Sequence, residues 1–161
     1  MKTKYIILIF LILVIALCCF LIFRKRVEIT SINSFYLTYT KGYAMNSYVR
    51  YELRYDKKEE KWLATIKPYG IEEENKKEVI VGEEISKNIE KILKEYHVEK
   101  WDGFEKRDKN VLDGDSFSLS VRMENDNDIS ASGYMMWPKN YRDVVNKVDE
   151  IFMKIYNENE E

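Results

Sequence analysis

Four oxygen-bearing side chains fall within one short stretch of the chain, at Asp108, Asn110, Asp113 and Asp115. Carboxylate and amide oxygens are the ligands that a hard cation such as calcium prefers. The spacing does not match an EF-hand loop, because Asp113 stands at the sixth position, where that loop needs glycine, and no glutamate closes it. We therefore expect no metal here, and interpret Asp113 and Gly114 as a turn that leads into a strand.

Nucleophilic and acid-base chemistry has few candidate residues. His97 is the single histidine, and it follows a predicted helix, so we interpret it as a helix-end residue. No Gly-x-Ser-x-Gly elbow is present, and both cysteines, Cys18 and Cys19, lie in the hydrophobic N-terminal segment. Glutamates and aspartates are abundant, so a carboxylate pair for glycoside cleavage stays open as the alternative. We expect a chain that is not an enzyme and has no cofactor.

Aromatic residues suggest a binding surface. Six tyrosines lie between residues 36 and 55, and alternation directs Tyr51 and Tyr55 towards the core while Tyr48 points to the other face. Exposed rings at Tyr43, Tyr48 and Trp101 could contact a protein, peptide or glycan partner. The alternative is that these aromatics only fill the sheet, which is the commoner use of such residues in strands.

The charge balance argues against nucleic acid as a partner. The chain has 26 basic and 28 acidic residues, but five of the basic ones precede residue 27, which leaves the remainder with a net charge of −7. Such a domain repels phosphates, and no basic stripe offsets the overall balance.

Periodicity predicts the elements that must position these residues. Alternation indicates strands around Leu37, around Tyr51, from Trp62 to Ile66, and from Phe117 to Met135 with a turn at 124–128. A short apolar run at 79–81 predicts a further strand. Helical spacing appears in two sets of apolar residues, namely Ile85, Ile89, Ile92, Leu93 and Tyr96, then Tyr141, Val144, Val145, Val148, Ile151, Phe152 and Ile155.

These elements predict one α+β domain over residues 27–161. We expect an antiparallel sheet of about five to six strands with two amphipathic helices on one face, and Pro138 in the first turn of the last helix. The apolar content of this part is sufficient to form a core without disulfides.

The first 26 residues predict a membrane anchor. Nineteen uncharged residues, Tyr5 to Phe23 with Leu11 and Leu17 among them, would span about 28 Å as a helix, close to the hydrocarbon core. No small-residue cleavage site ends the run, and Leu17 is unsuitable before a lipid-modified Cys18, so we expect an uncleaved anchor rather than a signal peptide or a lipoprotein. Basic residues flank both ends equally, so the charge rule does not orient it. We place the domain outside, because a basic start before an apolar run commonly directs export.

Three short motifs in the C-terminal half form a pattern: Trp101-Asp-Gly-Phe104, Leu112-Asp-Gly-Asp-Ser-Phe-Ser-Leu119 and Ser132-Gly-Tyr-Met-Met-Trp-Pro138. We interpret them as anchor points between helix and sheet. Over residues 98–155 the pattern resembles uncharacterised small membrane-anchored or lipoprotein-like proteins of Gram-positive bacteria. The resemblance implies an envelope setting and no chemistry. The sequence thus predicts a single-pass envelope protein of the cell membrane that binds a protein, peptide or wall component, with a carboxylate-dependent hydrolase of an envelope polymer as the alternative.

Overall fold

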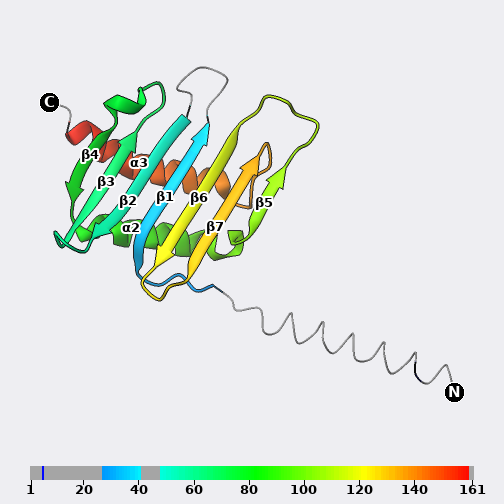
Figure 1. The fold of residues 1–161 in the computed structure, drawn as a ribbon, viewed down its shortest axis with the longest axis horizontal. Helices are drawn as coiled ribbons and strands as arrows, with labels where there is room; N and C mark the ends of the chain where they lie inside the picture. The colour runs from blue at the N-terminus through cyan, green and yellow to red at the C-terminus, as the bar shows by residue number, and fades with distance from the viewer. Residues whose placement is uncertain (1–4, 6–26, 41–47, 160–161) are drawn as a thin grey trace.

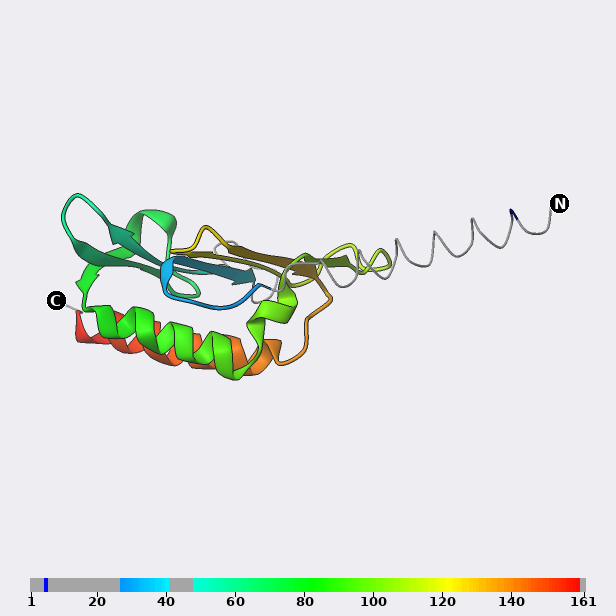
Figure 2. The same ribbon diagram turned by 90° about the horizontal axis from the view of Figure 1, so that it is seen from below.

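The computed structural model describes residues 5, 27–40 and 48–159. Within these residues, seven strands form one sheet and two long helices cover one of its faces (Figures 1 and 2). The mixed α+β architecture predicted from the sequence is confirmed. The strands are β1 (Ile32–Thr40), β2 (Tyr48–Asp56), β3 (Lys61–Lys67), β4 (Lys77–Val81), β5 (Phe104–Arg107), β6 (Ser116–Met123) and β7 (Asp128–Tyr134), and the helices are α2 (Glu83–Glu95) and α3 (Tyr141–Glu158).

The strand order across the sheet is β4-β3-β2-β1-β6-β7-β5. β1 therefore lies in the middle, with Leu37 opposite Tyr51 of β2 on one side and opposite Leu119 of β6 on the other. All neighbouring pairs are antiparallel except β5 and β7, which run parallel. The two hairpins, β2–β3 and β6–β7, flank the central strand and reach the same end of the sheet (Figure 1).

The core lies between the sheet and the two helices. Alternate residues of β1, such as Phe35 and Leu37, are buried on the helix side, as period-two strands require. From α3, Phe152 stacks between the rings of Phe35 and Tyr51, with centroid separations of 6.2 and 4.7 Å. The buried apolar residues of both helices and the sheet make one contiguous cluster.

Both predicted helices are confirmed, with one difference at the start of α3. The apolar face of α2 buries Ile89, Ile92 and Leu93 against the sheet. Pro138 was predicted in the first turn of α3, but the helix begins at Tyr141, after Asn140 in the left-handed region at φ 63°. The carbonyl of Pro138 accepts a hydrogen bond from the Tyr141 N–H, so proline belongs to the turn that precedes the helix.

The prediction of five to six strands was too low, because β5 was missed. This strand has only four residues, and three of them, Glu105 to Arg107, are exposed, so it carries no alternation. Its pairing with β7 is extended at each end by a backbone hydrogen bond. The Gly103 N–H donates to the Ser130 carbonyl, and the Asp108 N–H donates to the Tyr134 carbonyl. Backbone hydrogen bonds alone therefore define β5, and a side-chain pattern cannot indicate them.

The predicted membrane segment lies outside the described residues, apart from Tyr5. In the part of the chain that the structure describes, no helix has the length and apolar character to cross a membrane.

Candidate functional site

A hollow of about 590 Å³ opens at the end of the sheet where β1 begins and β2 ends. We call it the Tyr55–Trp62 pocket, because these two rings supply its aromatic surface. Six segments of the chain contribute to it, including both central hairpins and the start of α2. Its lining residues are Asn33, Tyr55, Glu60, Lys61, Trp62, Val81, Gly82, Glu83 and Glu124.

The aromatic pair is positioned by the register of three strands. Tyr55 of β2 lies directly opposite Trp62 of β3, which in turn lies opposite Val81 of β4. The two rings are tilted at 52° with centroids 5.3 Å apart. Tyr55 is 37% exposed although it lies on the face that the helices cover elsewhere, so the pair presents ring surface to solvent at the sheet's end.

Asp56 closes the β2–β3 turn, which contains Glu60, an acidic residue at the rim of the pocket. The backbone N–H groups of Lys58 and Glu59 both donate to its Oδ1, at 2.9 and 3.3 Å. These hydrogen bonds lower the pKa of Asp56. Glu60 completes the turn with a left-handed backbone, φ 50°, which is unusual for a residue with a side chain.

A β-bulge brings Asn33 into the pocket. Ile32 pairs with Met123 and Ser34 pairs with Arg122, so Asn33 is an extra residue in β1 that has no partner in β6. Bulges of this kind bend a strand and redirect a side chain, and they are common beside functional sites. The adjoining chain is fixed twice, since the Glu124 N–H donates to the Ser31 carbonyl and the Ile32 N–H donates to Glu90 Oε1, both at 2.9 Å.

The charged groups of the pocket are mainly negative. Glu60, Glu83 and Glu124 contribute three carboxylates, against the single ammonium group of Lys61. Glu83 pairs with Lys87 at 3.1 Å and Lys61 pairs with Glu59 at 3.8 Å. Within the described part of the chain, neither Glu60 nor Glu124 forms an ion pair, so both remain available to a ligand.

The open face of the sheet carries a second polar group, which we call the Glu73 cluster: Tyr48, Arg50, Lys67, Glu73 and Lys76. Glu73 accepts hydrogen bonds from Tyr48 Oη at 2.5 Å, from an Arg50 terminal nitrogen at 2.7 Å and from Lys76 Nζ at 2.9 Å. These donors, Tyr48 foremost, lower the pKa of Glu73 to about 2. Since Glu73 belongs to a short 3₁₀ turn, Glu73–Asn75, the cluster holds that turn against the sheet, on the side away from the helices (Figure 2).

Lys67 is the buried member of the Glu73 cluster. It is 0% exposed, and its Nζ donates to the Tyr48 carbonyl at 3.0 Å while lying 3.7 Å from the centre of the Tyr48 ring. Burial lowers the pKa of Lys67, and the Glu73 carboxylate opposes this effect. The cluster has three cationic groups and one carboxylate, but each of its members contacts Glu73 or Tyr48, so we interpret it as a fastening of the 3₁₀ turn rather than a ligand site.

Of the three residues predicted to form a binding surface, the structure describes Tyr48 and Trp101, and it does not bring these two together. Tyr48 does point away from the core, as alternation predicted, but its hydroxyl is bound to Glu73. Trp101 is 2% exposed and its indole N–H donates to the Lys139 carbonyl at 3.0 Å, so the expectation that it lies on an exposed surface is wrong. It packs beside Phe117 and Tyr141, in agreement with the interpretation of its motif as an anchor between helix and sheet. Tyr43 lies outside the described residues.

The oxygen-rich stretch forms the connection from β5 to β6. Asp108 Oδ1 accepts a hydrogen bond from the Asn110 N–H at 2.9 Å, which closes a local turn. Among the described residues, no group of three or more histidine, cysteine, aspartate or glutamate side chains is arranged to hold a metal. Gly114 is required for space rather than for a left-handed backbone, because a Cβ there would collide with the side chain of Met135. Asp113 and Asp115 each make further interactions.

His97 is a helix-end residue, as predicted. It follows α2 with a left-handed backbone, φ 57°, and its exposed ring lies 3.2 Å from Glu99. Asp149 is the acidic group that sequence reasoning overlooked in the core. It accepts hydrogen bonds from the hydroxyls of Tyr39, at 2.5 Å, and Tyr51. Burial, reinforced by Asp149, raises the pKa of both tyrosines.

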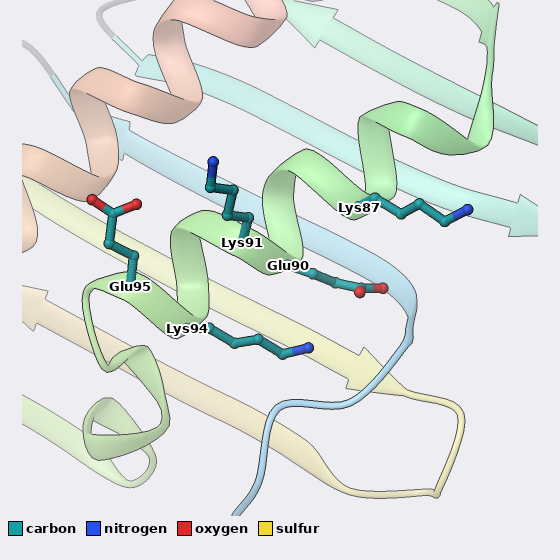
Figure 3. A pocket seen from close by; sticks show the side chains of 5 residues that line it. All are labelled: Lys87, Glu90, Lys91, Lys94 and Glu95. Atoms are coloured by element: carbon teal, nitrogen blue, oxygen red, sulfur yellow. The ribbon is translucent and has the colours of Figure 1, made fainter.

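A second hollow lies along the outer side of α2, between charged side chains of that helix alone (Figure 3). Its lining consists of Lys87, Glu90, Lys91, Lys94 and Glu95. Glu90 already binds the Ile32 N–H, and Lys87 already pairs with Glu83. All five lining residues are charged and come from one helix, so we interpret this surface as the solvated side of an amphipathic helix.

No family model matches the chain, and no curated protein matches it. Because no match indicates a site, the geometry of the lining residues alone defines the Tyr55–Trp62 pocket. The sequence pattern placed Tyr55, Ala64 and Trp62 on the core side of the sheet, which is correct for their face, but alternation does not show where the helical layer stops covering that face.

Proposed function

We propose that this chain is a membrane-anchored binding protein of the bacterial cell envelope, and that its ligand binds in the Tyr55–Trp62 pocket. Tyr5 to Phe23 would cross the membrane, with the domain on the outer side. A protein, a peptide or a wall component would be the ligand. The role is one of binding, without catalysis.

The observation that carries this proposal is an aromatic pair, exposed Tyr55 and half-buried Trp62, inside an open hollow. Aromatic side chains with a polar rim are typical of sites that grip a ligand by its apolar surface and orient it through a few polar groups. Tyr55 and Trp62 supply the apolar contact surface. Asn33 at the bulge, Glu60 and Glu124 supply the polar groups.

A hydrolase with two carboxylates is the weaker candidate. The general acid of such an enzyme needs a raised pKa so that it carries a proton at neutral pH. The carboxyl groups with clearly altered values, Asp56 and Glu73, both have lowered pKa values, each because hydrogen-bond donors favour the charged form. A lowered pKa leaves both groups ionised at neutral pH, so neither has a proton to donate as a general acid.

The test follows the three tryptophans separately. The full chain, labelled with 5-fluorotryptophan in detergent micelles, should give three ¹⁹F signals, and the signal of Trp62 is identified by its loss in Trp62→Phe. Addition of peptides and glycan oligomers should shift the Trp62 signal alone, while buried Trp101 serves as an internal control. Tyr55→Ala should weaken the response at least tenfold. Absence of any Trp62 shift across the panel would overturn the proposal.

A further inference from the structure

We infer that the Tyr55–Trp62 pocket takes a cationic group, the ammonium or guanidinium of a basic peptide. This inference rests on the proposed function, because it names the ligand class of the same site. It is argued from the charges that line the pocket, from the state of the adjoining helix N-terminus and from the two rings.

The lining favours a positive ligand. Three carboxylates face one ammonium group, and that ammonium group, on Lys61, is already paired with Glu59. Glu60 and Glu124 come from two different turns, β2–β3 and β6–β7, and have no cationic partner among the described residues. A cation between them gains two attractive interactions without breaking an existing ion pair.

The start of α2 does not oppose this assignment. A helix N-terminus carries partial positive charge and could attract an anion to the same place. Here the chain itself supplies the anion, since the carboxylate of Glu84 lies so close to Gly82 that a Cβ at this position would collide with it. Glu83 adds a second acid in the first turn. The partial charge is thus already compensated.

The aromatic pair completes a cation site. Ring faces attract ammonium and guanidinium groups, and carboxylates beside the rings add their own Coulomb attraction. A lysine or arginine side chain also has an aliphatic stem, which can lie along the exposed ring of Tyr55 while its charged end reaches the rim.

The experiment uses the fluorotryptophan-labelled full chain and four probes. They are acetyl-Gly-Lys-Gly-amide, the same peptide with acetyl-lysine, acetyl-Gly-Glu-Gly-amide and a neutral N-acetylglucosamine trimer. The lysine peptide should shift the Trp62 signal, and the acetyl-lysine and glutamate peptides should not. Raising the salt concentration from about 20 to 500 mM should weaken the response, because exposed charges are screened.

Charge-removing variants connect the response to the carboxylates. Glu60→Gln and Glu124→Gln should each weaken lysine-peptide binding about fivefold, which is the size expected for one partly exposed charge pair. Glu105→Gln on distant β5 is the matched control and should leave binding unchanged. A Trp62 shift with the neutral glycan but not with the lysine peptide would overturn the cationic assignment and leave the binding function standing. No shift with any probe would count against both.

Discussion

At the scale of single residues, Asp149 is the polar group on which the core depends most. It lies on the flank of α3 and accepts hydrogen bonds from the hydroxyls of Tyr39 and Tyr51. These two tyrosines are 4% and 2% exposed. A buried hydroxyl without a partner costs about 1–3 kcal/mol, whereas a bonded one contributes modestly. One carboxylate therefore permits two tyrosines to occupy positions that phenylalanine would otherwise fill.

Asp149→Leu should lower the free energy of unfolding by about 1–3 kcal/mol, because two hydroxyls lose their acceptor. Urea denaturation of the full chain measures it. Glu150→Leu, the same kind of change at the exposed neighbouring position, should stay within about 0.5 kcal/mol. In a Tyr39→Phe/Tyr51→Phe background the Asp149 substitution should cost less, and equal costs in both backgrounds would contradict the assignment.

Glu73 gives the domain an acid-sensitive contribution to stability. Its pKa is lowered from 4.5 to about 2 in the folded chain, so the folded state holds the proton less tightly than the unfolded state does. The contribution is therefore complete above about pH 4.5 and is lost as the pH falls towards 2. Glu73→Gln should flatten the pH dependence of unfolding in this window and cost up to about 1 kcal/mol at pH 7, as expected for a partly exposed cluster. Urea titrations at pH 7, 4 and 3 would show it. An unchanged slope would contradict this role.

At the scale of elements, β7 and the chain that follows it make a close approach. A Cβ at Gly133 would collide with the Met136 carbonyl oxygen and with the ring of Phe117, which is itself packed against Trp101, Phe104, Trp137 and Tyr141. The glycine therefore lets the 135–137 segment fold back over the aromatic group that joins β5, β6 and α3. The Ser132-Gly-Tyr motif has glycine at its centre because there is no space for a side chain at this position.

Gly133→Ala should lower the free energy of unfolding by about 2–3 kcal/mol, because backbone has to move to admit a methyl group. Gly70→Ala is the comparison, since Gly70 has open space around it and only a positive φ of 79°. We expect Gly70→Ala to lower the free energy of unfolding by about 1 kcal/mol. Thermal unfolding followed by near-ultraviolet circular dichroism reports both. Equal losses would show that backbone conformation, not the close approach, sets the requirement at residue 133.

Sequence patterns predicted the elements whose faces differ in polarity. β2 shows this well, because Val49, Tyr51 and Leu53 are buried while Arg50 and Glu52 between them lie on the opposite face, and α3 shows it through Val148 and Phe152. What remained unpredicted has no such signature. β5 is defined by parallel backbone pairing, the bulge at Asn33 by a single extra residue, and the pocket by where a helical layer ends.

At the scale of the whole molecule, each of the two helices is tied to the sheet by a charged side chain, Lys77 at α3 and Glu90 at α2. Lys77 of edge strand β4 donates to the carbonyls of Tyr156 and Asn159 at the end of α3, at 3.4 and 3.0 Å, and so satisfies free C-terminal carbonyl groups. Glu90 of α2 binds the first residue of β1. Contacts between distant parts of the chain thus close the single core at its margins.

The sidedness of the proposed membrane-anchored arrangement can be tested at Leu112, which is 90% exposed. Since both natural cysteines lie before residue 20, Leu112→Cys adds the one thiol of the domain. A membrane-impermeant maleimide should label this variant on intact cells to the same extent as in detergent, and the unsubstituted chain supplies the background. Labelling only after permeabilisation would place the domain inside and overturn the outer location.

The hydrogen bond between Ser31 and Glu124 also limits how far from a membrane the ligand can be met. Ser31 is attached to the pocket rim, and it is the eighth residue after Phe23, the last residue of the proposed anchor. A fully extended chain covers at most about 3.5 Å per residue, so the rim can stand no more than about 28 Å from the end of the anchor. In the proposed membrane-anchored arrangement, a partner that stays deeper in the surrounding wall is out of reach, so the ligand would be one that lies at, or arrives at, the membrane surface.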